Sequence, residues 1–234
     1  MHRVEQIMGM PIVVEVRGDD APFDEVFDWF RWVDATFSTY RPESEISRVA
    51  RGEPPVSPEA REILERCDQL RAQTNGYFDA YAGGTLDPSG LVKGWAVDRA
   101  ADLLDAAGVH EYVVNAGGDM RVRGTWRVGI QHPRERDAVA AVVEATDLAL
   151  ATSGEYARGR HVLDPHTGAP PLGVLSATIS GPDLATADAY ATAALAMGAS
   201  IAPHWVARLR GYGALLILDD ERVLSTPSFG CAPR

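Results

Sequence analysis

A carboxylate and a hydroxyl stand one helical turn apart in the last third of the chain. Asp188 and Thr192 occupy positions i and i+4 of LATADAYATAALAMG, so a helix there presents both on one face. Both are hard oxygen ligands that suit Mg²⁺, which keeps several waters and leans on substrate phosphates. The alternative is that Thr192 bonds its own helix while Asp188 faces solvent. The many alanines predict a closely packed helix, in which a buried carboxylate needs a partner.

The segment LDPSGLVKGWAVDRAADLL leads from a Pro–Ser–Gly turn into a helix. We expect this helix over about 93–107, with Lys93 and Gly94 in its first turn. Free backbone N–H groups at a helix start, together with one ammonium, suit a phosphate or pyrophosphate. The alternative is an ordinary loop with a solvent-exposed lysine, and spacing alone leaves both open.

Three polar residues cluster in RGRHVLDPHTGAPP, namely His161, Asp164 and His166. They are compatible with a metal site, with a turn built on Asp-Pro and Thr-Gly, or with a histidine general base. The usual phosphate loops and the G-x-S-x-G nucleophile motif are missing from the sequence. The triplet 152–154, Thr-Ser-Gly, resembles only a turn.

The helices that must position these groups show clear periodicity. Val26, Phe30, Val33 and Phe37 share one face of a helix over about 24–36. A second helix begins at the N-cap Ser57 and ends before the turn pair Asn75–Gly76. Its expected buried stripe consists of Ala60, Ile63, Cys67 and Leu70.

From residue 111 the hydrophobic period changes to two, which predicts short strands in EYVVNA, DMRVRG, TWRVGI, AVAAVVEAT and LSATIS. We also expect a strand around 3–17, helices over about 184–197 and 201–210, and a closing hairpin of GALLILDD and RVLST. Helices and strands are partly segregated. This favours an α+β fold with a mixed, largely antiparallel sheet and flanking helices, in a single domain over 1–234.

Acidic residues outnumber basic ones, 33 to 22, and the net charge is −11. A nucleic-acid binder usually carries a basic stripe, and none is visible. No run approaches the ~18 apolar residues of a membrane span, and the N-terminus lacks a signal-like apolar stretch. We therefore expect a cytoplasmic protein, the alternative being an exported one whose signal has been removed from this chain. Two cysteines, Cys67 and Cys231, are too few for a disulfide framework.

Taken together and in order, these segments are far more specific than any one of them. The series MGM, FSTYRPESEISRV, TNGYFDA, LDPSGLVKGWAVDRAADLL, VVNAGGDMRVRG, LATSGEYARG, HVLDPHTGAPP and ATISGPDLATADAYATAALAMG resembles the FAD:protein FMN transferases, the ApbE family of flavin transferases. The resemblance covers roughly residues 7–218. It implies an α+β, Mg²⁺-dependent enzyme that cleaves FAD, transfers FMN to a Ser or Thr hydroxyl of an acceptor protein and releases AMP.

The resemblance also implies roles for individual residues. His161 matches the histidine expected to deprotonate the acceptor hydroxyl, and Asp188 and Thr192 match the metal-binding helix. The Gly90 carbonyl matches a further Mg²⁺ ligand. The positions matched to the FAD site are Met8, Tyr40, Tyr77, Phe78, Asp79, Asp87, Lys93 and Leu163. The Asn115 and Gly117–Gly118–Asp119 block also matches, with no sharper role than a tight turn near the site.

One position departs from the pattern. Some family members have an Asp just before the metal-binding Thr, where this chain has Ala191, so one carboxylate fewer would surround the ion. Two rival functions stay open. The first is an FAD pyrophosphatase, with water as the nucleophile, and the second is a flavin-binding module without catalysis.

Overall fold

The computed structural model describes residues 1–18, 20–135, 137–154 and 162–230. Within these ranges an eight-stranded sheet runs in the order β1-β2-β3-β4-β7-β8-β9-β10, beside a two-stranded sheet, β5–β6, and every neighbouring pair is antiparallel. The expected α+β class is confirmed. The strands are β1 (His2–Ile7), β2 (Met10–Val16), β3 (Tyr112–Ala116), β4 (Asp119–Arg123), β5 (Thr125–Gln131), β6 (Val139–Thr146), β7 (Ala149–Gly154), β8 (Val174–Gly181), β9 (Gly213–Leu218) and β10 (Val223–Ser225).

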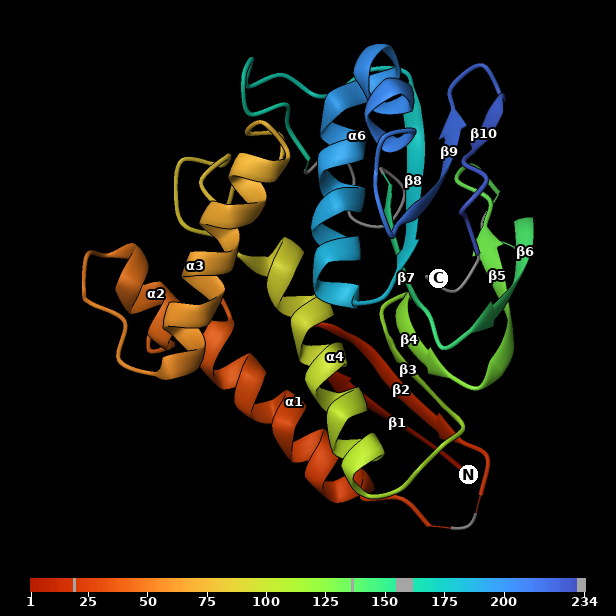
Figure 1. The fold of residues 1–234 in the computed structure, drawn as a ribbon. Helices are drawn as coiled ribbons and strands as arrows, with labels where there is room; N and C mark the ends of the chain where they lie inside the picture. Colours follow the sequence, from red (N-terminus) through yellow and green to blue (C-terminus); the bar gives the residue numbers. More distant parts are fainter. Residues whose placement is uncertain (19, 136, 155–161, 231–234) are drawn as a thin grey trace.

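The helices gather on one side of the main sheet (Figure 1). They are α1 (Phe23–Phe37), α2 (Glu45–Ala50), α3 (Pro58–Gln73), α4 (Ser89–Ala106) and α6 (Leu184–Val206). Helix α6 packs on β7 and β8, while α4 packs on β3 and β4 and also contacts α1, α3 and α6. None of the described helices is both long and apolar enough to cross a membrane.

The periodic helices form as their sequences predict. The four predicted apolar residues of α1 are buried, as is the predicted stripe of α3, Cys67 included. Ser57 caps α3, because its Oγ accepts the Ala60 N–H at 3.1 Å. Short helix α2, in contrast, was not expected. It is capped by Ser44, whose hydroxyl accepts the Ser47 N–H.

The expected single strand over 3–17 is wrong, because the chain reverses at its middle. Met8 and Gly9 both have positive φ, 55° and 71°, and join β1 to β2 as a hairpin. Positive φ at both central residues is the signature of a type I′ turn, which matches the twist of paired strands. Met8 therefore holds a backbone conformation that side chains rarely adopt.

The triplet Thr152–Ser153–Gly154 is not a turn but the end of β7, which pairs with β8 along its full length. Successive side chains of β7 point to opposite faces of the sheet and so enter two different hydrophobic cores. Ala149 and Ala151 belong to the core under the helices, while Leu150 belongs to a second core under the β5–β6 hairpin. The hairpin thus covers the face of β4 and β7 opposite to the helices.

Two helix boundaries also differ from expectation. Helix α4 begins at Ser89 rather than near 93, because the Asp87 carboxylate accepts the Ser89 N–H at 3.0 Å and fixes the start. Lys93 consequently lies in the second turn. The two helices expected over about 184–197 and 201–210 are both present within α6, joined at Gly198, whose φ of 63° and ψ of −179° are not helical, but the second ends at Val206 rather than near 210.

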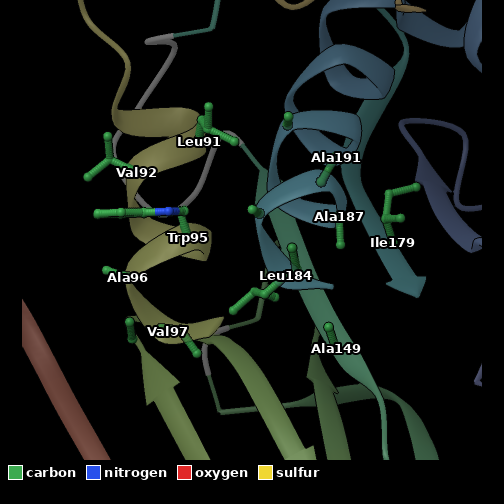
Figure 2. Close-up of a cluster of buried hydrophobic side chains, with 14 of the residues drawn as sticks. Leu91, Val92, Trp95, Ala96, Val97, Ala149, Ile179, Leu184, Ala187 and Ala191 are labelled. Atoms are coloured by element: carbon green, nitrogen blue, oxygen red, sulfur yellow. The ribbon is translucent and has the colours of Figure 1, made fainter. Parts of the chain in front are cut away.

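Helices α4 and α6 approach each other closely enough to require small residues between them. Figure 2 shows the two helices side by side, with the Leu184 side chain of α6 reaching toward α4, while the Trp95 ring of α4 points away from α6 and packs on Trp29 and Phe37 of α1. At Gly94 the approach is closest, since a Cβ there would lie 2.5 Å from the carbonyl oxygen of Leu184. This contact fixes the helix that carries Asp188 against the helix that carries Lys93.

Candidate active site

Asp188 and Thr192 lie on the face of α6 that points toward α4 and β7. Asp188 is only 2% exposed, so the solvent-facing alternative is excluded. The Thr192 hydroxyl lies 3.2 Å from Ser153 Oγ on β7. It also borders Gly90 in the first turn of α4, where a Cβ would come within 3.5 Å of Thr192 Oγ1. The three residues matched to metal ligands therefore come from two helices packed side by side.

Lys93 enters the same site from α4 and meets two carboxylates. Its Nζ pairs with Asp119 Oδ2 and lies 3.5 Å from Asp188 Oδ1. Asp119, the first residue of β4, is 1% exposed, and its other oxygen accepts the Thr152 N–H at 2.8 Å. The ammonium thus sits between two buried carboxylates, and the alternative of a solvent-exposed lysine is excluded.

The protonation of Asp188 reflects its surroundings. Burial raises the pKa of this carboxyl above its ordinary value, and the nearby Asp119 raises it further, while Lys93 and the Gly94 N–H oppose them. Among the residues that the structure describes, none hydrogen-bonds Asp188 Oδ2, although that atom is buried. A buried carboxylate oxygen without a donor is a position where a cation would be stabilised.

Asp98 fixes the start of the helix that carries the ligands. Its carboxylate accepts the N–H groups of Leu184 and Ala185 at 2.8–2.9 Å, and Arg121 lies 3.6 Å away. Burial raises the pKa of Asp98 to about 6, so it is still mainly ionised at neutral pH. A negative charge at a helix N-terminus is favourable, and here it fixes the position of α6 relative to α4.

Two tight turns close the site from the sheet. The β3–β4 turn lies against the β1–β2 hairpin, since a Cβ on Gly117 would lie 2.9 Å from the Met10 sulfur. Asn115 stabilises the β3–β4 turn, because its Oδ1 accepts the Gly118 N–H at 2.9 Å. This turn delivers Asp119 to Lys93. The Asn115–Asp119 block therefore does more than make a turn.

Met8 lies at the tip of that hairpin and lines a surface hollow of about 530 Å³. Arg31, Asp34 and Arg41 line the hollow from the helical side. Tyr40, the neighbour of Arg41, is 94% exposed. Its exposed side chain is therefore accessible to a ligand.

The three side chains of the Tyr77–Phe78–Asp79 segment have different surroundings. Phe78 is buried beside Gly90, with its ring edge 3.3 Å from where a glycine Cβ would be. The Tyr77 ring meets the His166 imidazole edge-on at 4.6 Å between centroids. Asp79 accepts the Tyr81 N–H and pairs with Arg71, so its carboxylate organises the turn.

The other predicted residues are placed less informatively. Asp87 is exposed and accepts the Ser89 N–H just before α4, and Leu163 is half-buried. His161, the predicted base, lies outside the described residues. Asp164 accepts the His166 N–H at 2.9 Å and the Thr167 hydroxyl at 3.0 Å. Those contacts favour a turn at this segment over a metal site.

Sequence reasoning missed the ion pair of Asp119 and the hydroxyl of Ser153. Asp119 directly follows two glycines and begins the strand Asp119–Arg123, and an acidic residue fixed at the end of a tight turn was the one local signal that could have pointed to it. Ser153 carried no comparable signal. Within the described ranges no three His, Cys, Asp or Glu side chains form a metal cluster. A cation here would rely on one carboxylate, a hydroxyl and backbone oxygen, a donor set that suits Mg²⁺ with waters.

Comparisons with known proteins point to one family. The model of the ApbE family matches residues 8–85 and 80–216. A Vibrio cholerae FAD:protein FMN transferase is 36% identical over 155 residues, covering 59% of this chain and 46% of the relative. A Rhodobacter capsulatus FAD:protein FMN transferase is 37% identical, over 61% of this chain and 30% of the relative. The chain thus spans less than half the length of these two relatives.

Solved structures match the fold over nearly the whole chain. The flavin transferase ApbE from Vibrio cholerae superposes with a TM-score of 0.87 at 24% identity, covering 98% of this chain and 97% of that one. The ApbE protein from Thermotoga maritima gives a TM-score of 0.88 at 22% identity, over 100% and 99% of the two chains. At these identities the likeness establishes the fold.

Proposed function

Because this chain belongs to the ApbE family, we propose that it transfers FMN from FAD to a serine or threonine hydroxyl of an acceptor protein and releases AMP. One observation in the structure supports this most strongly. Asp188 Oδ2 is buried without a donor among the described residues, its Oδ1 lies 3.5 Å from Lys93 Nζ, and Thr192, one turn further along α6, borders Gly90. A pyrophosphate substrate requires such charge neutralisation.

The residues fit a divalent cation. Asp188, Thr192 and the Gly90 carbonyl would hold Mg²⁺, which when bound supplies positive charge at the pyrophosphate. Lys93 adds a fixed ammonium at the same place, and the buried surroundings strengthen its field. Phe78 and the Met8 hairpin border the site and would orient the flavin. Each of these groups positions the substrate or neutralises its charge, which are the main contributions in phosphoryl transfer.

The chemical step follows from the chemistry of the substrate. The acceptor oxygen attacks the phosphorus of the FMN half of FAD, forming a phosphoester while the bond to the AMP phosphate breaks. The proton of the acceptor hydroxyl goes to His161, the base that the family resemblance implies. A histidine near its ordinary pKa of about 6.5 accepts a proton readily at neutral pH.

The proposal is tested by FAD cleavage with and without metal. AMP release from FAD should need a divalent cation, stop with excess chelator and be lost in Asp188→Ala. FAD should still bind that variant, because the flavin and adenine contacts lie elsewhere. Asp68→Ala, which removes an exposed carboxylate from α3, serves as the control and should keep full activity. Unchanged turnover in excess chelator would contradict the proposal.

A further inference from the structure

Asp119 is a buried charge that the proposed chemistry does not use directly. It starts β4 at the end of the turn held by Asn115, and only 1% of its surface is exposed. Ionised carboxylates are rarely buried unless they are paired and hydrogen-bonded. Asp119 meets both conditions, through the Thr152 N–H on one oxygen and the Lys93 ammonium on the other.

Lys93 is therefore shared unequally between two carboxylates. Its Nζ lies in direct contact with Asp119, while 3.5 Å separates it from Asp188 Oδ1. The lysine side chain is 22% exposed, whereas the two aspartate side chains are 2–3% exposed. Asp119 is therefore the more closely paired of the two carboxylates, and Asp188 the less closely paired.

We infer that Asp119 is a positioning residue: it holds the Lys93 ammonium away from full contact with Asp188 and so keeps Asp188 available to a divalent cation. This inference rests on the proposed function, because it assigns the cation to Asp188 and Thr192. Among the described residues, Asp188 is the other carboxylate within ion-pair distance of Lys93, so without the charge of Asp119 the ammonium is drawn toward it. The ammonium would then pair closely with Asp188 and compete with the metal.

The inference makes opposite predictions for two single variants. Asp119→Asn keeps a carbonyl oxygen for the Thr152 N–H but loses the charge that holds Lys93, so metal affinity should fall by about 10- to 100-fold, the range for partners of metal ligands. Lys93→Met removes the competing ammonium and leaves more negative charge around Asp188. Metal affinity should then equal or exceed that of the wild type.

The double variant separates positioning from a merely structural role. If Asp119 acts through Lys93, Asp119→Asn combined with Lys93→Met should bind metal within a few-fold of the wild type, since no ammonium is left to compete. If Asp119 only supports the β3–β4 turn, the double variant should bind as poorly as Asp119→Asn. Such a rescue is the non-additivity expected of residues in contact.

The experiment titrates the full chain with Mn²⁺ at pH 8, without FAD, and follows free Mn²⁺ by electron paramagnetic resonance. Thermal melts of every variant check folding. If Asp119→Asn is unfolded, Lys93→Met decides instead: weaker Mn²⁺ binding by Lys93→Met than by the wild type would overturn the inference. Asp188→Ala is the reference for the proposed site. Undiminished Mn²⁺ binding in Asp188→Ala would contradict that site itself. Loss of binding there, with normal binding in Asp119→Asn, would contradict only the role of Asp119.

Discussion

Replacing Gly94 by alanine tests whether the contact between α4 and α6 sets the geometry of the site. A Cβ at Gly94 would lie 2.5 Å from Leu184 O and 2.9 Å from Ala185 Cα, both backbone atoms that cannot rotate away. Ordinary contact begins near 3.4 Å, so the start of α6 must move by about 0.9 Å. The same two residues donate their N–H groups to Asp98 at 2.8–2.9 Å, and those bonds would be stretched beyond useful length.

Opposing effects determine the magnitude. Overpacking of this kind costs about 1–3 kcal/mol, and weakening hydrogen bonds to a charged group adds about 1.5–3 kcal/mol. Because alanine favours a helix more than glycine does, the substitution also adds about 1 kcal/mol to the free energy of unfolding. The free energy of unfolding should therefore fall by about 1.5–5 kcal/mol, which corresponds to a Tm lower by roughly 3–20 °C in a chain of this size.

Urea denaturation and Mn²⁺ titration together provide the assay. Gly94→Ala should be less stable and should bind Mn²⁺ more weakly, because Asp188 follows Leu184 by one turn and moves with it. Ala106→Gly, at the exposed last residue of the same helix, is the control that alters α4 without touching α6. A Gly94→Ala protein as stable as the wild type, with unchanged Mn²⁺ affinity, would refute the close contact.

Three further predictions follow from particular contacts. Because burial raises the pKa of Asp98 from 3.8 to about 6, the folded protein holds this proton more tightly than the unfolded chain. The free energy of unfolding should thus fall by up to about 3 kcal/mol as the pH rises from about 4 to 6. In urea titrations, Asp98→Asn should lose this dependence on pH. The same pH dependence in the wild type and in Asp98→Asn would contradict the prediction. Burial also raises the pKa of the Cys67 thiol to about 12, so in a Cys231→Ser background the folded protein should not react with a thiol reagent at pH 8, whereas rapid labelling without urea would show that Cys67 is accessible. His166→Ala should leave Mn²⁺ affinity unchanged and raise the KM for FAD only a few-fold through Tyr77, and bound metal lost in this variant would instead support a metal site at Asp164 and His166.

Much of this architecture could be predicted from local patterns. The stripes of α1 and α3, the Ser57 cap and the pairing of Asp188 with Thr192 on one face all depend on residues a few positions apart, where helix geometry fixes the outcome. The resemblance to a family then supplied roles that spacing left open. Contacts between segments that lie far apart in the sequence could not be predicted in this way.

The misses have physical reasons. The strand ending in Thr152 and Ser153 is buried on both faces and rich in alanine, so it shows no alternation to mark it. Helix α4 begins earlier than expected, at Ser89, whose N–H is bonded by the Asp87 carboxylate, whereas a Pro–Ser–Gly segment resembles a turn when read alone. The pairing of Lys93 with Asp119 exists only because the β3–β4 turn meets α4 in the folded chain, and no local pattern encodes that meeting.

Transfer of FMN itself is tested most directly by mass balance. The chain is incubated with FAD, Mg²⁺ and a candidate acceptor, the apo form of an FMN-binding part of a redox enzyme, and also with that acceptor carrying alanine at its candidate Ser or Thr. Mass spectrometry measures modified acceptor while chromatography measures AMP. We predict one AMP released for each acceptor that gains an FMN phosphoester, and no modification of the alanine form. Equal amounts of free FMN and AMP with an unmodified acceptor would identify a pyrophosphatase instead, and bound but uncleaved FAD would identify a binding module; either result contradicts the proposed transferase.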